Sequence, residues 1–102
     1  MAGPIVDYDA GKFTWAYTAG SVPATELRLK WGTAPNTYPN QKVYAPATTG
    51  ADVHDVLAAG SKGQFYAILV SANAKGEGVK SGEVPFLVTD GLPDGSLSLS
   101  VG

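Results

Sequence analysis

A strict alternation of apolar and charged residues is the feature that most restricts the fold of this chain. In the segment 26–31, Leu27, Leu29 and Trp31 alternate with three charged residues. Successive side chains of a β-strand point to opposite faces, whereas an amphipathic helix needs apolar residues three or four positions apart. The segment therefore predicts a strand with one buried face and one charged face, which is typical of an antiparallel sheet.

Other segments also have the character of strands. The segment 13–17 alternates in the same way, the segment 65–70 is apolar almost throughout, and the segment 84–88 is a short apolar run interrupted by Pro85. Because proline cannot donate a hydrogen bond to a neighbouring strand, we expect Pro85 at a sheet edge or a bulge. The segment 51–59 fits either a strand or one helical turn, and we expect a strand because the flanking glycines leave a helix little length.

Glycine and proline divide the chain into short pieces. Thirteen glycines and seven prolines are distributed over 102 residues, and no uninterrupted helical pattern survives between them. A chain of this length forms one domain. Its hydrophobic fraction of 44% is typical of a globular protein with a core of its own. Short strands separated by turns, without intervening helices, predict an all-β fold built from two packed sheets.

Three motifs follow one another along residues 5–88. Trp15 stands in the first alternating segment, and the segment 27–31 is the second motif. The third begins at Leu57 and passes through a glycine-containing link to Tyr66. It continues with apolar residues at alternate positions, an alanine, an asparagine and a glycine-rich hairpin. Together the motifs resemble a fibronectin type III domain, a seven-stranded antiparallel immunoglobulin-like sandwich of two sheets.

The resemblance has implications for single residues and for the domain boundary. It implies that Tyr66 forms a tyrosine corner, in which the hydroxyl bonds to the backbone a few residues upstream. It places the sandwich at residues 1–88, followed by a C-terminal linker and tail strand at residues 89–102. Another immunoglobulin-like sandwich is the alternative. The predicted structural core consists of Trp15, Leu29, Trp31, Leu57, Tyr66, Ile68 and Val70.

The composition excludes several classes of protein. The chain has no cysteine, which excludes disulfide scaffolds, thiolate metal sites and cysteine nucleophiles. Its net charge of −2 has the wrong sign for a nucleic-acid-binding protein. No apolar run approaches the roughly 20 residues that cross a bilayer, so we expect no membrane insertion. The first residues lack the basic and apolar regions of a secretory signal, so we expect the protein to be made in the cytosol.

Few residues of the sequence are suited to catalysis. His54, the only histidine, lies near Asp52 and Asp55, but no serine motif accompanies them. We expect His54 to be an ordinary half-exposed strand residue. Asp7 and Asp9 are expected to be solvated carboxylates near the first strand rather than a calcium or glycosidase site. The sequence therefore predicts no enzyme activity, no catalytic residue, no cofactor and no bound metal.

Three features are candidates for binding a partner. One is the hairpin 73–81, which by the resemblance corresponds to a loop where many family members make contacts. Tyr38 and Tyr44 lie near one connection, and exposed aromatic rings are favoured at interfaces. Leu97, Leu99 and Val101 alternate with serines at the C-terminal end. A lone terminal strand leaves its backbone groups unpaired, so we expect it to join an edge of this domain or of another subunit. A turn-rich stretch at 90–95 reads as the linker that would let it reach outward.

The sequence thus favours a non-enzymatic structural or binding module. Together with the resemblance, the small isolated domain suggests a bacteriophage virion accessory protein, such as a capsid decoration, neck or tail component. Its expected partners are capsid, neck or tail subunits, or copies of itself, bound through an edge strand or the C-terminal tail. The alternative is a carbohydrate-binding or cell-surface-binding module from a larger secreted protein, and a passive spacer is a further possibility.

Overall fold

The computed structural model of the chain describes residues 3–90 and 96–102. Strands dominate the described part, so the prediction of an all-β fold is confirmed. The described residues form eight strands and one helical turn: β1 (Ile5–Asp7), β2 (Lys12–Thr14), β3 (Glu26–Gly32), β4 (Asn40–Tyr44), β5 (Gly50–Asp52), α1 (Val53–Val56), β6 (Gly63–Asn73), β7 (Gly76–Lys80) and β8 (Val84–Thr89).

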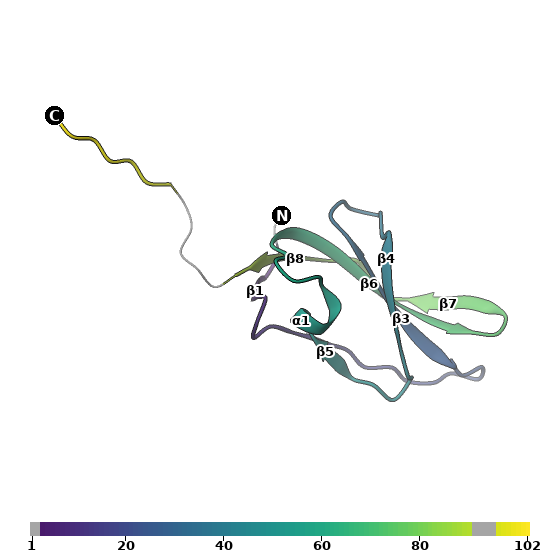
Figure 1. Cartoon of the computed structure of the whole chain (residues 1–102). Helices are drawn as coiled ribbons and strands as arrows, with labels where there is room; N and C mark the ends of the chain where they lie inside the picture. Colours follow the sequence, from purple (N-terminus) through teal and green to yellow (C-terminus); the bar gives the residue numbers. More distant parts are fainter. Residues whose placement is uncertain (1–2, 91–95) are drawn as a thin grey trace.

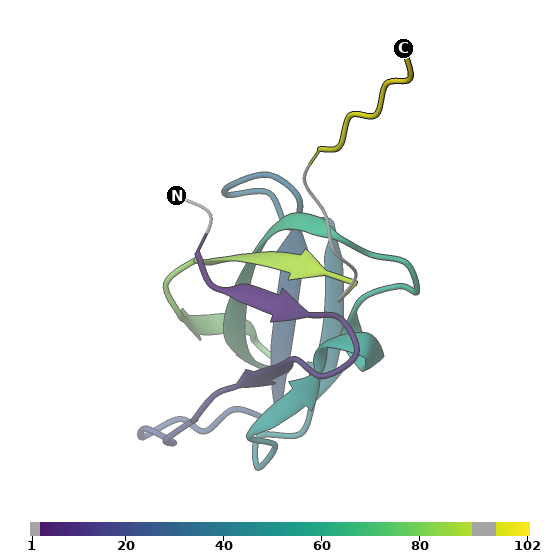
Figure 2. The same ribbon diagram turned by 90° about the vertical axis from the view of Figure 1, so that its left-hand side faces the viewer.

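The strands form one large and one small sheet. The large sheet has the order β1-β8-β6-β3-β4, with β7 paired to β6, and the small sheet consists of β2 and β5. Within the large sheet only β1 and β8 run parallel. The small sheet and α1 lie across one face of the large sheet (Figures 1 and 2). Among the described residues, no helix is long and apolar enough to cross a membrane.

The prediction of seven strands is wrong by one for the described residues. β3 pairs with one edge of β6, so β7 and β8 share the other edge. β7 pairs with β6 between Val70 and Asn73, and β8 pairs with it between Gly63 and Ala67. Between them, Ser81 bonds Leu69 twice: its N–H donates to the Leu69 carbonyl at 2.8 Å, and its Oγ accepts the Leu69 N–H at 2.9 Å. β7 and β8 thus lie one after the other along the same edge of β6.

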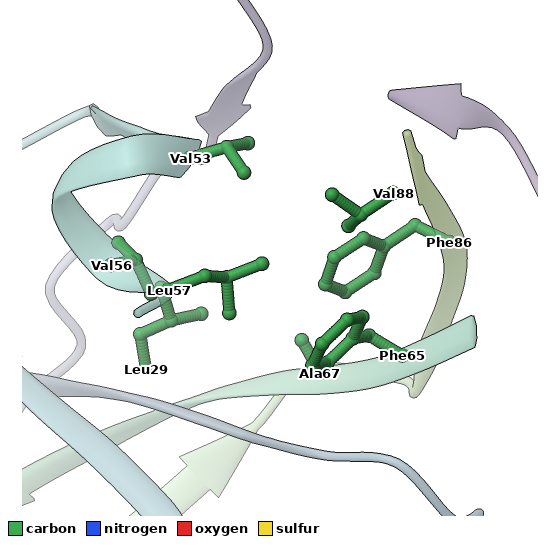
Figure 3. Close-up of a cluster of buried hydrophobic side chains, with 8 residues drawn as sticks. All are labelled: Leu29, Val53, Val56, Leu57, Phe65, Ala67, Phe86 and Val88. Atoms are coloured by element: carbon green, nitrogen blue, oxygen red, sulfur yellow. The ribbon is translucent and has the colours of Figure 1, made fainter. Parts of the chain in front are cut away.

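The core lies between the two sheets. Phe86 is its centre, with the Phe65 ring stacked at 5.7 Å between centroids and the Phe13 ring edge-on at 5.4 Å. The large sheet and the residues after β5 contribute to it from opposite sides (Figure 3). The buried cluster consists of Leu29, Val53, Val56, Leu57, Phe65, Ala67, Phe86 and Val88.

The strand expected at 51–59 is wrong beyond its first two residues. β5 ends at Asp52, and the helical turn α1 follows, closed by a hydrogen bond of 2.9 Å from the Leu57 N–H to the Val53 carbonyl. The reason is the spacing of the apolar residues: Val53, Val56 and Leu57 lie on one side of a helical turn and are all buried. The strand expected at 13–17 is also shorter, because β2 ends at Thr14.

Both faces of β6 are buried, but in different ways. Phe65, Ala67 and Leu69 contact the core between the sheets. Ile68 and Val70 are also buried, yet they alternate with the core-facing residues and therefore lie on the outer face of the large sheet. Ion-paired side chains cover that face, as described below. The two buried faces explain why this strand is apolar almost throughout.

Tyr66 does not form the tyrosine corner that the resemblance implies. It lies on the outer face of β6, opposite Gly32 and Pro85, and its hydroxyl has no hydrogen bond within the described residues. A different tyrosine ties strand and connection together: the Tyr8 hydroxyl donates to the Leu57 carbonyl at 3.0 Å. The expected register of the sixth strand is thus shifted by one residue, which reverses its faces.

Pro85 lies near one end of β8, opposite Tyr66 of β6. The pairing of β8 with β1 begins only at Leu87. Pro85 therefore lies beyond the part of β8 that is paired on both sides, where a missing N–H is tolerated.

Candidate functional site

The C-terminal tail, residues 96–102, has a row of exposed apolar side chains. Leu97, Leu99 and Val101 are each at least 92% exposed. The tail forms no strand with the described residues of its own chain, and Figure 1 shows it extending away from the sheets. Most of the linker expected at 90–95 lies outside the described residues. Of the candidate binding residues, these three have the most accessible side chains.

A groove lies at the end of the molecule where β6 and β7 form a hairpin. It has a volume of about 790 Å³ and is bounded by residues 16–24 on one side and by the hairpin on the other. After Thr14 the chain leaves β2, and residues 16–24 form a wall of the groove instead of a strand. Its floor includes Leu27 and Leu69.

Two exposed valines face this groove from opposite walls. Val22 is 73% exposed and Val79 is 81% exposed. The loop that carries Val22 is held by Tyr17, whose hydroxyl accepts the Ala24 N–H at 2.8 Å. On the hairpin, the Ser71 hydroxyl donates to the Val79 carbonyl at 3.1 Å, next to an irregularity in the β6–β7 register. Local hydrogen bonds therefore hold the backbone of both segments that carry the valines.

An ion-paired network covers the outer face of the large sheet. Arg28 contacts Glu26 at 2.6 Å and Glu77 at 2.9 Å, and Lys30 contacts Glu77 at 2.6 Å. Arg28 stands opposite Val70 and Lys30 opposite Ile68, so their aliphatic stems lie beside these buried residues. Lys30 and then Arg28 lower the pKa of Glu77, and Glu26 and then Glu77 raise the pKa of Arg28. The network accounts for the burial of this face.

Tyr38 uses its hydroxyl to close a loop. It donates to the Glu83 carboxylate, which also accepts the Asn36 N–H at 2.7 Å. The Asn36 N–H and then the Tyr38 hydroxyl lower the pKa of Glu83, and the carboxylate is the main cause that raises the pKa of Tyr38. Asn36 has a φ of 59°, in the left-handed region that asparagine tolerates. Tyr38 thus fastens the β3–β4 connection to the residue before β8.

Tyr44 lies on the core-facing side of β4 instead of projecting as a free ring. Its ring packs against Trp15 at 5.3 Å between centroids, and Trp15 Nε1 donates to the Thr48 carbonyl at 2.7 Å. The Tyr44 hydroxyl is buried and has no hydrogen-bond partner among the described residues. Burial is the main cause that raises its pKa, followed by the charge of Asp55. Tyr44 therefore contributes to packing at the margin of the core.

The aromatic residues near this connection form no common platform. Tyr44 stands opposite Leu27, whereas Trp31 stands at the far end of β3, opposite Asn40. Both Trp15 and Trp31 are partly buried and pack against the core cluster. An exposed row of rings, which a flat ligand would need, is therefore not present among Trp31, Tyr38 and Tyr44.

Asp52, His54 and Asp55 come together, although the strand expected over this segment would place His54 and Asp55 on opposite faces. The helical turn brings one ligand atom from each within 4.8 Å of the others. Two lysines are adjacent: Lys12 lies 3.7 Å from the Asp52 carboxylate, and Lys42 donates to the Asp55 carbonyl at 2.9 Å. Two ammonium groups and high exposure both weaken attraction for a cation, so this cluster is a poor metal centre.

The sequence indicates one wall of the groove, the hairpin 73–81, but it singles out neither Val22 nor Val79 nor the groove itself. Val22 and Val79 are single apolar residues within stretches rich in serine, proline and glycine, and periodicity gives no signal at such positions. The two valines line one groove because the fold brings together two segments that are far apart in the sequence. No protein-family model, curated protein or solved structure matches the chain.

Proposed function

We propose that this chain is a non-enzymatic module that attaches to a larger protein assembly through its C-terminal tail. The observation that supports this function is the row formed by Leu97, Leu99 and Val101, each almost fully exposed and unpaired within the described residues. Removing such apolar side chains from water stabilises a complex by about 1.5–3 kcal/mol for each fully buried residue. Strand addition would supply backbone hydrogen bonds as well.

We further propose that the two sheets form a sandwich of the fibronectin type III type. The strand order supports this: β2 and β5 pair with each other, while β3, β4, β6 and β8 belong to the opposite sheet. Immunoglobulin-like sandwiches divide their strands between two sheets in this manner. If β7 and β8 are taken as one interrupted strand, the count becomes seven. The position of Tyr66 is the feature that departs from the family pattern.

A virion is the assembly that we propose for this module, as a capsid decoration, neck or tail component. Its surface is repetitive, so many copies can bind side by side. Modest affinity for each copy then suffices where neighbouring copies are also linked to one another. The sheets would face outward while the tail holds each copy in the assembly.

Occupancy of particles tests this function. Virus particles are purified from a strain that carries this sequence. The amount of the protein in these particles is measured by mass spectrometry. We expect that replacing Leu97, Leu99 and Val101 together by serine removes most of the protein from the particles. The matched control replaces Ser98 and Ser100 by alanine and should leave occupancy unchanged. Unchanged occupancy of the triple serine variant would refute docking by the tail.

The carbohydrate-binding alternative receives less support from the structure. Tyr44 packs against Trp15, so its ring is no free stacking surface, and the Tyr38 hydroxyl is occupied by its bond to Glu83. A glycan array separates the two functions, because our proposal expects no sugar binding by the unmodified chain. Binding that disappears in Tyr38→Ala or Tyr44→Ala would favour the alternative.

A further inference from the structure

Two apolar surfaces have no partner among the described residues, the tail and the groove. We infer that the tail of one copy binds in the groove of a second copy, as a strand added to the outer edge of β7. This inference rests on the proposed function, since it names the partner of the same tail. Five of the eight large apolar residues that are exposed in the described part lie on these two surfaces: Val22, Val79, Leu97, Leu99 and Val101.

The hairpin offers an edge of the right length for an added strand. β7 comprises the five residues Gly76–Lys80 and, within the described chain, pairs only with β6. The alternating part of the tail, residues 97–101, also has five residues. Exposed edge strands readily take up another strand, because their N–H and C=O groups are unpaired.

The side chains of an added tail strand would match the groove. Lys80 stands opposite Val70 and therefore points to the outer face, so its neighbour Val79 points to the inner side, where it lines the groove. Leu97, Leu99 and Val101 all lie on one face of an extended tail. If that face of the tail strand is turned towards the groove, its three apolar side chains lie beside Val79 and extend the apolar surface towards Val22.

Charge also favours this pairing. The only charged residue between positions 91 and 102 is acidic, Asp94. The groove is lined by Lys75 and Lys80, and its one acidic residue, Glu77, is already paired with Arg28 and Lys30. An apolar tail preceded by an aspartate therefore meets a groove with two lysines beside it.

Geometry favours a second copy over the tail's own domain. β8 ends beside Gly63, at one end of β6, whereas the groove begins near Leu69. These positions are six residues apart on β6, or about 20 Å, and Asn73 lies about 13 Å further. Leu97 follows Thr89 by eight residues, which span at most about 29 Å. The tail would have to turn back and run almost fully extended along the domain, whereas the tail of a neighbour has no such constraint.

Because the tail and the groove are different surfaces, the contact joins unlike surfaces. Such head-to-tail contacts form closed rings or open chains. The expected solution behaviour is a mass that rises with concentration, at least doubling from the 10.5 kDa of one chain. Light scattering coupled to size-exclusion chromatography measures this mass.

Two complementary variants test the contact. A chain that ends at Gly95 keeps the groove but lacks the tail, and Val79→Asp keeps the tail but carries a charge in the groove. Each should be monomeric alone. Their mixture should form a 1:1 complex of about twice the monomer mass, because one intact tail then meets one intact groove. Val43→Asp, at a 48% exposed site on β4 outside the groove, is the matched control and should associate like the unmodified chain.

Three results would overturn the inference: a monomeric unmodified chain at every concentration, association of Val79→Asp equal to that of the unmodified chain, or no complex in the mixture. Circular dichroism confirms that each variant is folded, which is expected because Val79 is an exposed residue. The outcome is separable from that of the proposed function. A chain that is monomeric in solution but enters particles only with its tail refutes this inference alone, and a chain that associates but is absent from particles refutes the virion role alone.

Discussion

At the scale of single residues, the tyrosines of this chain differ in whether their hydroxyls have partners. The Tyr8 hydroxyl donates to the Leu57 carbonyl at 3.0 Å and joins the segment after β1 to the end of α1. The Tyr44 hydroxyl is buried without a partner among the described residues. A buried polar group without a hydrogen bond costs about 1–3 kcal/mol, whereas a satisfied one contributes about 0.5–1.5 kcal/mol.

The same substitution should therefore have opposite effects at the two positions. We expect Tyr44→Phe to raise the free energy of unfolding by about 1 kcal/mol, because it removes the unpaired hydroxyl and keeps the ring against Trp15. Tyr8→Phe, the matched control, should lower it by about 1 kcal/mol. Urea unfolding followed by tryptophan fluorescence measures both. A destabilised Tyr44→Phe would show that its hydroxyl has a partner in solution.

Glu77 should make stability depend on acidity. Its pKa is lowered by Lys30 and then by Arg28, so the folded state holds the carboxylate in its charged form. The stabilising contribution is present above the ordinary pKa of 4.5 and is lost as the pH falls through the lower pKa of the folded state. We expect the unmodified protein to lose more stability than Glu77→Gln when acidified below about pH 4.5. Equal losses in urea unfolding series at several pH values would contradict this.

At the scale of elements, the predictions from sequence differ in quality from strand to strand. β3 was predicted correctly because its outer residues are charged, so only one of its faces could be buried. β6 has apolar residues on both faces, since the ion-paired network covers Ile68 and Val70, and alternation therefore could not identify the core-facing side. The turn α1 was not predicted, because in so short a segment Val53, Val56 and Leu57 fit either a strand or one helical turn. The groove depends on contacts between distant loops, which no local pattern encodes.

β8 offers a test of how far the core extends along one face of the strand. Phe86 is buried between Phe13 and Phe65, so Phe86→Ala should lower the free energy of unfolding by about 3–5 kcal/mol. Val84 lies two residues earlier on the same strand and is 51% exposed, so Val84→Ala should change it by about 0.5 kcal/mol or less. Chemical denaturation of both variants measures the difference. Similar effects at the two positions would contradict the placement of the core at Phe86.

At the scale of the whole molecule, the tail and the two sheets should be independent in dilute solution. Leu97, Leu99 and Val101 are almost fully exposed, so the fold gains nothing from them. We expect a chain ending at Gly95 to unfold at the same midpoint as the unmodified chain at low concentration. A lower midpoint for the shortened chain would show that the tail packs on its own domain. At high concentration the unmodified chain should be the more stable, because association stabilises the folded state.

The parallel pairing of β1 with β8 bears on how the molecule would respond to tension. β8 leads into the tail and is held on one side by β6 and on the other by β1. A pull on the tail acts along the axis of β8. The hydrogen bonds of β8 to β1 and to β6 are then loaded together, in shear, instead of breaking one after another. A strand held in this way yields only when it slips as a whole along both neighbours, so the end of the sheet that leads into the tail resists extension.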